Sequence, residues 1–234
     1  MKKLFEKYET LFCILLILLY ILVNSYCINS FGLYDYRSAI INTIFSSFLV
    51  ILMIVLKRTS YYGLTRLNDL RKYLYFIPLL LIVSVNLWNG ININNSLEET
   101  IFYMFNMINV GFIEEIIFRG FLFKMMAKDN VKWAIIISSV TFGIGHIINL
   151  FNGSDLVFTL LQIGYAISIG YLFVIIFYKS KSLIPCIITH SLVNALSIFN
   201  VVNTISIYVS SIFLIIVPLV YTIYINKIIK NQDI

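Results

Sequence analysis

Apolar residues along this chain come in long runs that short polar segments interrupt. A helix needs about 20 predominantly apolar residues to cross the hydrocarbon core of a bilayer, and eight runs come near or exceed that length. The pattern predicts an all-α, polytopic integral membrane protein with about eight transmembrane helices. The predicted spans are residues 10–28, 39–56, 73–88, 99–124, 132–150, 156–178, 183–200 and 204–226.

The composition also indicates a membrane protein. Of the 234 residues, 60% are hydrophobic and 12% are charged, and a soluble domain of this length could not hide so much apolar surface. Three lysines precede the first span, as in a signal peptide, but no small-residue cleavage site follows it, so we expect a retained anchor. Without an internal repeat, residues 1–234 are interpreted as a single integral membrane domain.

Lysine and arginine are distributed unevenly between the segments that flank the predicted spans. From the N-terminus through the successive loops to the C-terminus they number 3, 1, 5, 0, 3, 0, 2, 0 and 2, and Arg119 lies within a span. This alternation is what the positive-inside rule predicts for eight spans with both termini in the cytoplasm. The net charge of +6 therefore reflects topology and does not indicate a nucleic-acid partner. The abundance of Ile, Asn and Lys is typical of AT-rich bacterial genomes, so we expect a bacterial plasma membrane.

Ionisable side chains inside the predicted spans indicate a reactive site. Glu114 and Glu115 are the only acidic residues within the spans proper, and the two histidines of the chain, His146 and His190, also lie in spans. A charged side chain at the bilayer centre costs about 3 kcal/mol or more, so such residues normally face a cavity and mark a functional site. We therefore expect an intramembrane catalytic cavity formed by three helices.

The spacing of these residues suggests separate roles. Glu115 and Arg119 are four positions apart and share a helix face, so the arginine can keep the buried carboxylate ionised. Glu114 lies about 100° around the helix and has no dedicated cation, which favours it as a general base. His190 and Asn194 are also four positions apart, and both can donate hydrogen bonds to a developing oxyanion.

His146 follows Phe142 by one helical turn, and Gly143 and Gly145 between them permit close approach of another helix. A base, a histidine that orients water and two hydrogen-bond donors are suited to the attack of water on a carbonyl group. A lone histidine or asparagine on an apolar helix is more often an interhelical hydrogen-bonding residue. The two adjacent glutamates argue against that simpler interpretation here, because they are so costly to bury.

Other hydrolytic chemistries have weaker support in the sequence. Cys186 lies one turn before His190, but the three cysteines are scattered and lack CxxC spacing, which favours an inert role. The chain contains no HExxH metalloprotease motif, no intramembrane aspartate for an aspartyl dyad and no GxSG serine motif. Glu114 and its neighbours therefore remain the favoured candidates.

Three motifs occur in order, each on a predicted span: Glu114-Glu115-x-x-x-Arg119, Phe142-x-x-x-His146 and His190-x-x-x-Asn194. Together they resemble the signature of the CAAX protease and bacteriocin-processing family, also called CPBP or Abi, which is similar to the type II CAAX prenyl endopeptidases. The motifs lie within a core of about residues 99–200. Outside this core the likeness is one of hydrophobic pattern.

The resemblance implies an intramembrane endopeptidase of eight helices whose cavity is reached from the cytoplasm. The implied roles are water activation by Glu114 with His146, oxyanion binding by His190 and Asn194, and stabilisation of the site by Glu115 and Arg119. Such proteins have been described both as metalloproteases and as metal-independent glutamate proteases. Because glutamate and histidine are also zinc ligands, a divalent metal such as zinc stays open beside the metal-free mechanism that we favour.

The expected partners are the membrane lipid bilayer and a membrane-associated peptide or protein substrate. Bacterial proteins of this kind are associated with bacteriocin self-immunity and peptide maturation, so we predict cleavage of a small membrane-bound peptide. The alternative is a non-catalytic bacteriocin-immunity or membrane scaffold protein that binds a peptide in the same cavity. A proton-coupled transporter is a third hypothesis, which the lack of inverted repeats and broken half-helices disfavours. Nothing in the sequence indicates an oligomeric state.

Overall fold

The computed structural model describes residues 2–67 and 70–228, and every extended regular element among them is a helix. The only β pairing in this part of the chain is an isolated bridge between Ile91 and Asn200. The α-helices are α1 (Lys2–Lys7), α2 (Glu9–Ser30), α3 (Tyr36–Val55), α4 (Leu79–Ser84), α5 (Leu97–Glu115), α6 (Lys124–Met126), α7 (Val131–Gly145), α8 (Ile148–Phe151), α9 (Leu156–Ser180), α10 (Ile184–Leu196) and α11 (Thr204–Ile228).

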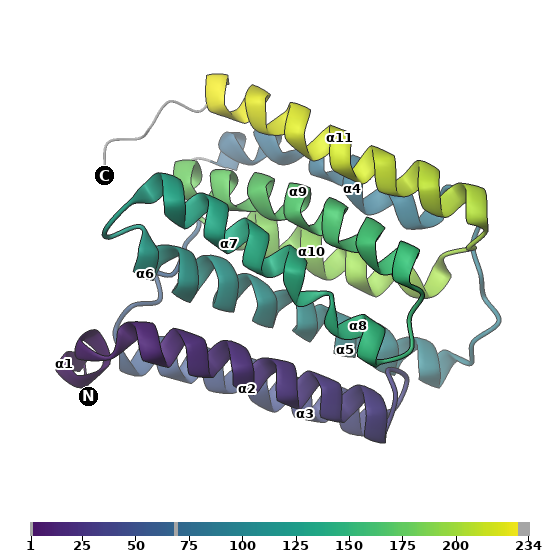
Figure 1. The fold of residues 1–234 in the computed structure, drawn as a ribbon, viewed down its shortest axis with the longest axis horizontal. Helices are drawn as coiled ribbons and strands as arrows, with labels where there is room; N and C mark the ends of the chain where they lie inside the picture. Colours follow the sequence, from purple (N-terminus) through teal and green to yellow (C-terminus); the bar gives the residue numbers. More distant parts are fainter. Residues whose placement is uncertain (1, 68–69, 229–234) are drawn as a thin grey trace.

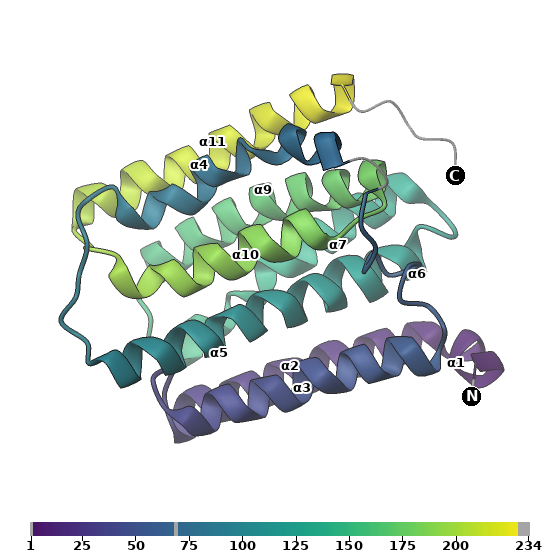
Figure 2. The ribbon, with the colours of Figure 1, turned by 180° about the vertical axis from the view of Figure 1, so that it is seen from behind.

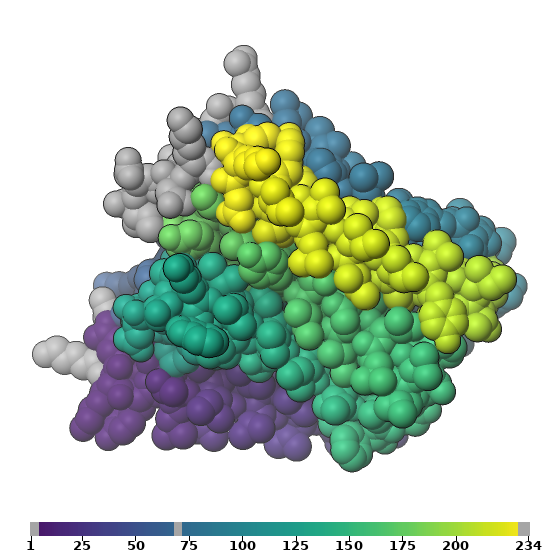
Figure 3. Space-filling model, turned by 45° about the horizontal axis from the view of Figure 1, so that its top comes forward, coloured from purple at the N-terminus to yellow at the C-terminus, as the bar shows by residue number. Residues whose placement is uncertain are grey.

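The long helices lie side by side in three layers (Figures 1 and 2). The pair α2 and α3 forms one outer layer, α5, α7, α9 and α10 form the middle, and α4 and α11 form the opposite layer. Figure 3 shows α11 lying across one face, with α9 beneath it and α2 along the opposite edge. The middle layer is therefore shielded on both sides by apolar helices.

Six helical segments of the described residues are long and apolar enough to cross a membrane. They are Glu9–Ser30, Tyr36–Val55, Leu97–Met126, Val131–Phe151, Leu156–Ser180 and Thr204–Ile228. These segments confirm a multi-pass helical membrane protein, and they correspond to six of the eight predicted spans. The total of eight is not confirmed.

The two remaining predicted spans form shorter helical segments. Residues 73–88 are divided between a 3₁₀ segment (Leu70–Phe76), α4 and a second 3₁₀ turn (Val85–Leu87), with Pro78 just before α4. Proline lacks a backbone N–H and interrupts a continuous helix. The span predicted at 183–200 forms α10, which has Pro185 in its first turn and continues into a 3₁₀ turn. At about 1.5 Å per residue, 13 helical residues are shorter than the hydrocarbon core.

Basic residues gather at one end of the bundle. Lys57 and Arg58 follow α3, Lys128 follows α6 and Lys181 follows α9, all at the end where α1 lies (Figure 1). The connections at the opposite end contribute one basic side chain among the described residues, that of Arg37 in the first turn of α3. Such a charge difference is the pattern that orients membrane proteins, and a cytoplasmic location of the basic end stays a prediction.

Two glycines allow neighbouring helices to come very close. A Cβ atom at Gly111 of α5 would lie 2.8 Å from the backbone of Ser191 in α10. At Gly143 of α7 it would collide with the side chain of Ile167 and lie 2.9 Å from the backbone nitrogen of that residue in α9. Gly145 has no atom within 4 Å of its Cβ position, so only the first of the two glycines predicted in α7 provides a close approach.

The pair Gly143 and Gly145 offers a matched test of this packing. We expect Gly143→Ala to lower the thermal stability of the purified protein in detergent by an amount equivalent to about 1–3 kcal/mol, because its methyl group has no space. Gly145→Ala adds the same methyl group to the same helix where there is room, and should leave the melting temperature near that of the wild type. Equal melting temperatures for the two variants would contradict the close contact of α7 and α9.

Candidate active site

The two adjacent glutamates lie where the helix geometry changes. Ser96 and Glu99 form a capping box that starts α5, and Glu114 and Glu115 are the last residues of this helix. A π-helix covering Ile116–Phe123 follows, and all eight of its residues are buried. Because π-helical segments are rare and frequent at functional sites, this change of winding next to two carboxylates supports a functional role.

The wider π-helical turn is held by a neighbouring helix. The hydroxyl of Ser138 in α7 donates a hydrogen bond of 2.8 Å to the carbonyl oxygen of Phe118. A side-chain donor of this kind satisfies a backbone acceptor in an apolar interior, where an unpaired carbonyl would be costly. The contact also ties α7 to the segment that contains Arg119.

The predicted contact between Glu115 and Arg119 is present. Oε1 of Glu115 lies 3.0 Å from Nη1 of Arg119, and both side chains are 0% exposed. The three guanidinium nitrogens and Oε2 of Glu115 have no hydrogen-bond partner in the described part of the chain. Among the described residues Glu115 is therefore the one carboxylate that balances the guanidinium, and the ion pair offsets part of the cost of burying these two charges.

Aromatic rings supply the rest of the environment of Arg119. Its guanidinium carbon lies 4.1 Å from the ring centroid of Phe142 and 5.8 Å from that of Phe173, within the range of a cation–π interaction. A Cβ atom at Gly170 of α9 would lie 3.0 Å from Nη2 of Arg119, so the absence of a side chain there makes room for the arginine. The sequence contains no signal for this function of Gly170.

His190 bridges the two carboxylates. Its Nδ1 lies 2.8 Å from Oε1 of Glu115, and its Nε2 lies 3.3 Å from Oε2 of Glu114. Because the carboxylate of Glu115 pairs with Arg119 and accepts hydrogen bonds, we assign a proton to Nδ1. Nε2 is thereby directed at Glu114. The side chains of His190 and Glu114 are 10% and 12% exposed, so they are more accessible than those of Glu115 and Arg119, which are fully buried.

Glu114 has a second partner, from a helix that the motifs do not include. The hydroxyl of Tyr20 in α2 donates a hydrogen bond of 2.6 Å to Oε1 of Glu114, and Tyr20 is only 5% exposed. Sequence reasoning missed this residue because Tyr20 is one of 16 tyrosines and lies 94 positions from Glu114. Oε2 of Glu114 faces Nε2 of His190 at 3.3 Å and accepts no hydrogen bond from the other described residues, so it is the more available oxygen of this carboxylate.

His146 and Asn194 lie at the border of this cluster. His146 follows the last residue of α7, where the chain turns toward α8, and its ring centroid is 5.5 Å from that of Phe142. The ring centroid of His190 also lies close to Phe142, at 5.6 Å. Asn194 is partly buried one turn after His190, and its side chain makes no hydrogen bond to the described residues. Phe142 thus adjoins both histidines, while the direct contacts join Glu114, Glu115, Arg119 and His190.

Ser191, next to His190 in the chain, and the cysteines given an inert role from the sequence have surroundings that fit packing. The hydroxyl of Ser191 donates a hydrogen bond of 3.0 Å to the carbonyl oxygen of Ile108. Cys186 is fully buried, and its thiol lies 3.5 Å from the carbonyl oxygen of Phe173. Cys13 and Cys27 are buried free thiols as well. None of these groups is hydrogen-bonded to the carboxylates of Glu114 and Glu115.

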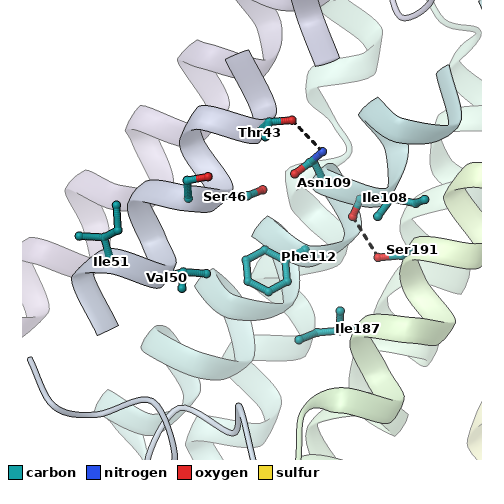
Figure 4. Close-up of a pocket in the computed structure, with 10 residues that line it drawn as sticks. Thr43, Ser46, Val50, Ile51, Ile108, Asn109, Phe112, Ile187 and Ser191 are labelled. Atoms are coloured by element: carbon teal, nitrogen blue, oxygen red, sulfur yellow. Dashed lines mark hydrogen bonds between the residues drawn. The ribbon is translucent and has the colours of Figure 1, made fainter. Parts of the chain in front are cut away.

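A pocket of about 450 Å³ lies between α3, α5 and α10 (Figure 4). Phe112, Ile187 and Ser191 line it, and each is near a cluster residue in the chain. Glu114 and His190 are not among the lining residues, so a catalytic cavity around them is not confirmed. Figure 4 shows a hydrogen bond from Asn109 to Thr43 along one wall, with a length of 3.2 Å.

The donor set fits a zinc site poorly. Within residues 2–67 and 70–228, no three His, Cys, Asp or Glu side chains converge as metal ligands. Glu115, which would have to act as ligand if Glu114 were the base, is bonded to Arg119 and His190 through the same oxygen. Catalytic zinc commonly takes three protein ligands and water, and such a set would need rearranged side chains here.

Comparison with known proteins supports the interpretation of the motifs. No curated protein and no solved structure matches the chain. Residues 96–196 match the family model "Type II CAAX prenyl endopeptidase Rce1-like", and this segment contains all three motifs. The match confirms the predicted resemblance: residues 96–196 form a segment similar to the Rce1-like type II CAAX prenyl endopeptidases, a family of membrane proteases.

Proposed function

We propose that this protein is an intramembrane endopeptidase that hydrolyses a peptide bond of a membrane-associated peptide or protein through glutamate-activated water. One observation carries the proposal: an imidazole, that of His190, lies between Oε2 of Glu114 and the Arg119-paired carboxylate of Glu115. The family match over the same residues supports peptidase chemistry. A structural ion pair of Glu115 with Arg119 would not require a second buried carboxylate beside it.

In the proposed reaction Glu114 is the general base. Oε2 of Glu114 takes a proton from water while the water oxygen bonds to the carbonyl carbon of the substrate, which gives a tetrahedral oxyanion. The proton then passes from Glu114 to the amide nitrogen, the carbon–nitrogen bond breaks, and an amine and a carboxylic acid leave. Glu115 and Arg119 hold His190 in place through Nδ1, so that Nε2 stays beside the reacting groups.

His146, His190 and Asn194 are the proposed donors around this centre. His146, whose ring adjoins Phe142 as that of His190 does, would orient the water. His190 would carry a proton on both ring nitrogens, so that Nδ1–H bonds Glu115 while Nε2–H, together with the amide of Asn194, donates a hydrogen bond to the oxyanion. The partly buried amide of Asn194 has no partner among the described residues and is therefore available for such a bond. Preorganised donors of this kind stabilise the transition state without rearranging as charge develops.

The proposed substrate is a small membrane-bound peptide, with a role in bacteriocin self-immunity or peptide maturation. The proposed location is a bacterial plasma membrane with both termini in the cytoplasm. Both described ends of the chain lie at the basic end of the bundle, which supports a common side for the two termini (Figure 1). A membrane-associated substrate fits a site whose residues come from apolar helices.

Cleavage of a quenched lipidated peptide by the purified protein in proteoliposomes tests this function. We expect the wild-type protein to cut the peptide, and to keep its rate after dialysis against a chelator, because the cluster lacks three converging metal ligands. The variant Glu114→Gln, which lacks the proposed general base, is the negative control. Loss of activity with the chelator and recovery on adding zinc would overturn the metal-free mechanism while leaving the peptidase function intact.

A further inference from the structure

The strongest contact of the proposed base comes from outside the segment that matches the protease family. Tyr20 lies in α2, whereas the family match begins at residue 96. Its hydroxyl donates the 2.6 Å hydrogen bond to Oε1 of Glu114, and this is the one side-chain hydrogen bond that Glu114 accepts from the described residues. A short bond from a hydroxyl to a carboxylate is charge-assisted and strong.

The position of Tyr20 is set by a contact of its ring with α3 and by ion pairs at the start of its own helix. Its ring centroid lies 6.2 Å from that of Phe45 in α3. Eleven residues earlier in the same helix, the buried carboxylate of Glu9 forms ion pairs with Lys128 and with Arg58, the latter at 3.8 Å. The ring and the helix are thereby anchored independently of the hydroxyl, which is then presented to Glu114.

We propose that Tyr20 is a positioning residue of the active site. By holding Oε1 of Glu114 it fixes the rotation of the carboxylate, so that Oε2 stays 3.3 Å from Nε2 of His190 and receives the proton of water. This inference rests on the function proposed above. It adds that α2, outside the matched segment, is required to complete the site.

The substitution Tyr20→Phe removes the hydroxyl and keeps the ring that packs against Phe45. In the proteoliposome assay we expect kcat to fall by about tenfold or more, because hydrogen bonds to charged groups contribute that much, while KM stays unchanged. Tyr221→Phe is the matched control, since Tyr221 of α11 is also buried and its hydroxyl donates a hydrogen bond to the carbonyl oxygen of Tyr75, which is not a residue of the proposed site. The melting temperatures of the two variants should fall by similar amounts.

An infrared measurement tests the same bond without activity. The difference spectrum between the wild type and Tyr20→Phe should contain a shifted glutamate carboxylate band, and that band should be missing when both proteins also carry Glu114→Gln. A kcat for Tyr20→Phe equal to that of Tyr221→Phe, or a difference spectrum without the band, would overturn the role of Tyr20. If folded wild type cuts no peptide, or Glu114→Gln still cuts, the proposed function fails instead, and the infrared band still decides whether Tyr20 positions Glu114.

Discussion

Glu114→Gln is expected to reduce kcat/KM for peptide cleavage by about 100- to 10,000-fold, the range that a positioned general base contributes. The amide has nearly the same shape as the carboxylate, so it can still accept the hydrogen bond from Tyr20, and the fold should persist. The amide cannot take a proton from water, so the chemical step is lost. Rates measured in proteoliposomes at saturating and limiting peptide concentrations separate this loss from a change in KM.

Glu98→Gln is the matched control for this substitution. Glu98 lies in the first turn of the same helix, is exposed and makes no side-chain hydrogen bond to the described residues, so its neutralisation should leave the rate unchanged. Retained cleavage by Glu114→Gln would contradict the role of Glu114 as base. If that variant also protected cells from a peptide toxin as well as the wild type does, the non-catalytic binding function would account for the protein better.

Arg119→Met is expected to destabilise the folded protein by about 3–5 kcal/mol, the range found when one partner of a buried ion pair is removed. The substitution keeps an apolar side chain between Phe142 and Phe173, but it leaves the fully buried carboxylate of Glu115 without its cation. His190 then faces two carboxylates with no arginine to balance them. Unfolding in detergent, followed by intrinsic fluorescence, measures the loss of stability.

The double substitution Glu115→Gln with Arg119→Met separates charge from shape. Removing the carboxylate together with its arginine should restore most of the lost stability, because a neutral amide costs much less to bury than an unpaired charge. Cleavage should stay low, since His190 no longer has an ionised partner at Nδ1. If Arg119→Met were as stable as the wild type, or if the double variant were less stable than Arg119→Met, the ion pair would not be the main stabilising contact of these residues.

Much of the fold follows from the hydrophobic pattern. In lipid each backbone polar group needs an internal partner, so long apolar runs must form helices, and six of the eight predicted spans do so at full length. The other two are shorter than their apolar composition suggests. Pro78 divides one of them, and the second ends in a 3₁₀ turn after 13 helical residues. Hydropathy reports apolar character and is insensitive to such interruptions.

The site could be predicted in part. The contact of Glu115 with Arg119 follows from a spacing of four residues on one helix. The bridge from His190 to Glu115 spans 75 positions, and the bond from Tyr20 to Glu114 spans 94. Contacts of that range depend on which helices become neighbours. The roles of these residues, and of His146 and Asn194, stay predictions, and the substitutions above test those of Glu114, Glu115, Arg119 and Tyr20.

By itself the sequence determined that the chain is a helical membrane protein, that its basic residues mark one end, and that three motifs occur in the order typical of a protease family. These properties are local, because they depend on composition, spacing and order along the chain. Only the tertiary structure decided that the helix after Glu115 widens into a π-helix, whose residues are all buried. It also decided that the hydroxyl of Tyr20 reaches the carboxylate of Glu114. Both arise from helix packing, and packing joins residues whose separation in sequence carries no signal.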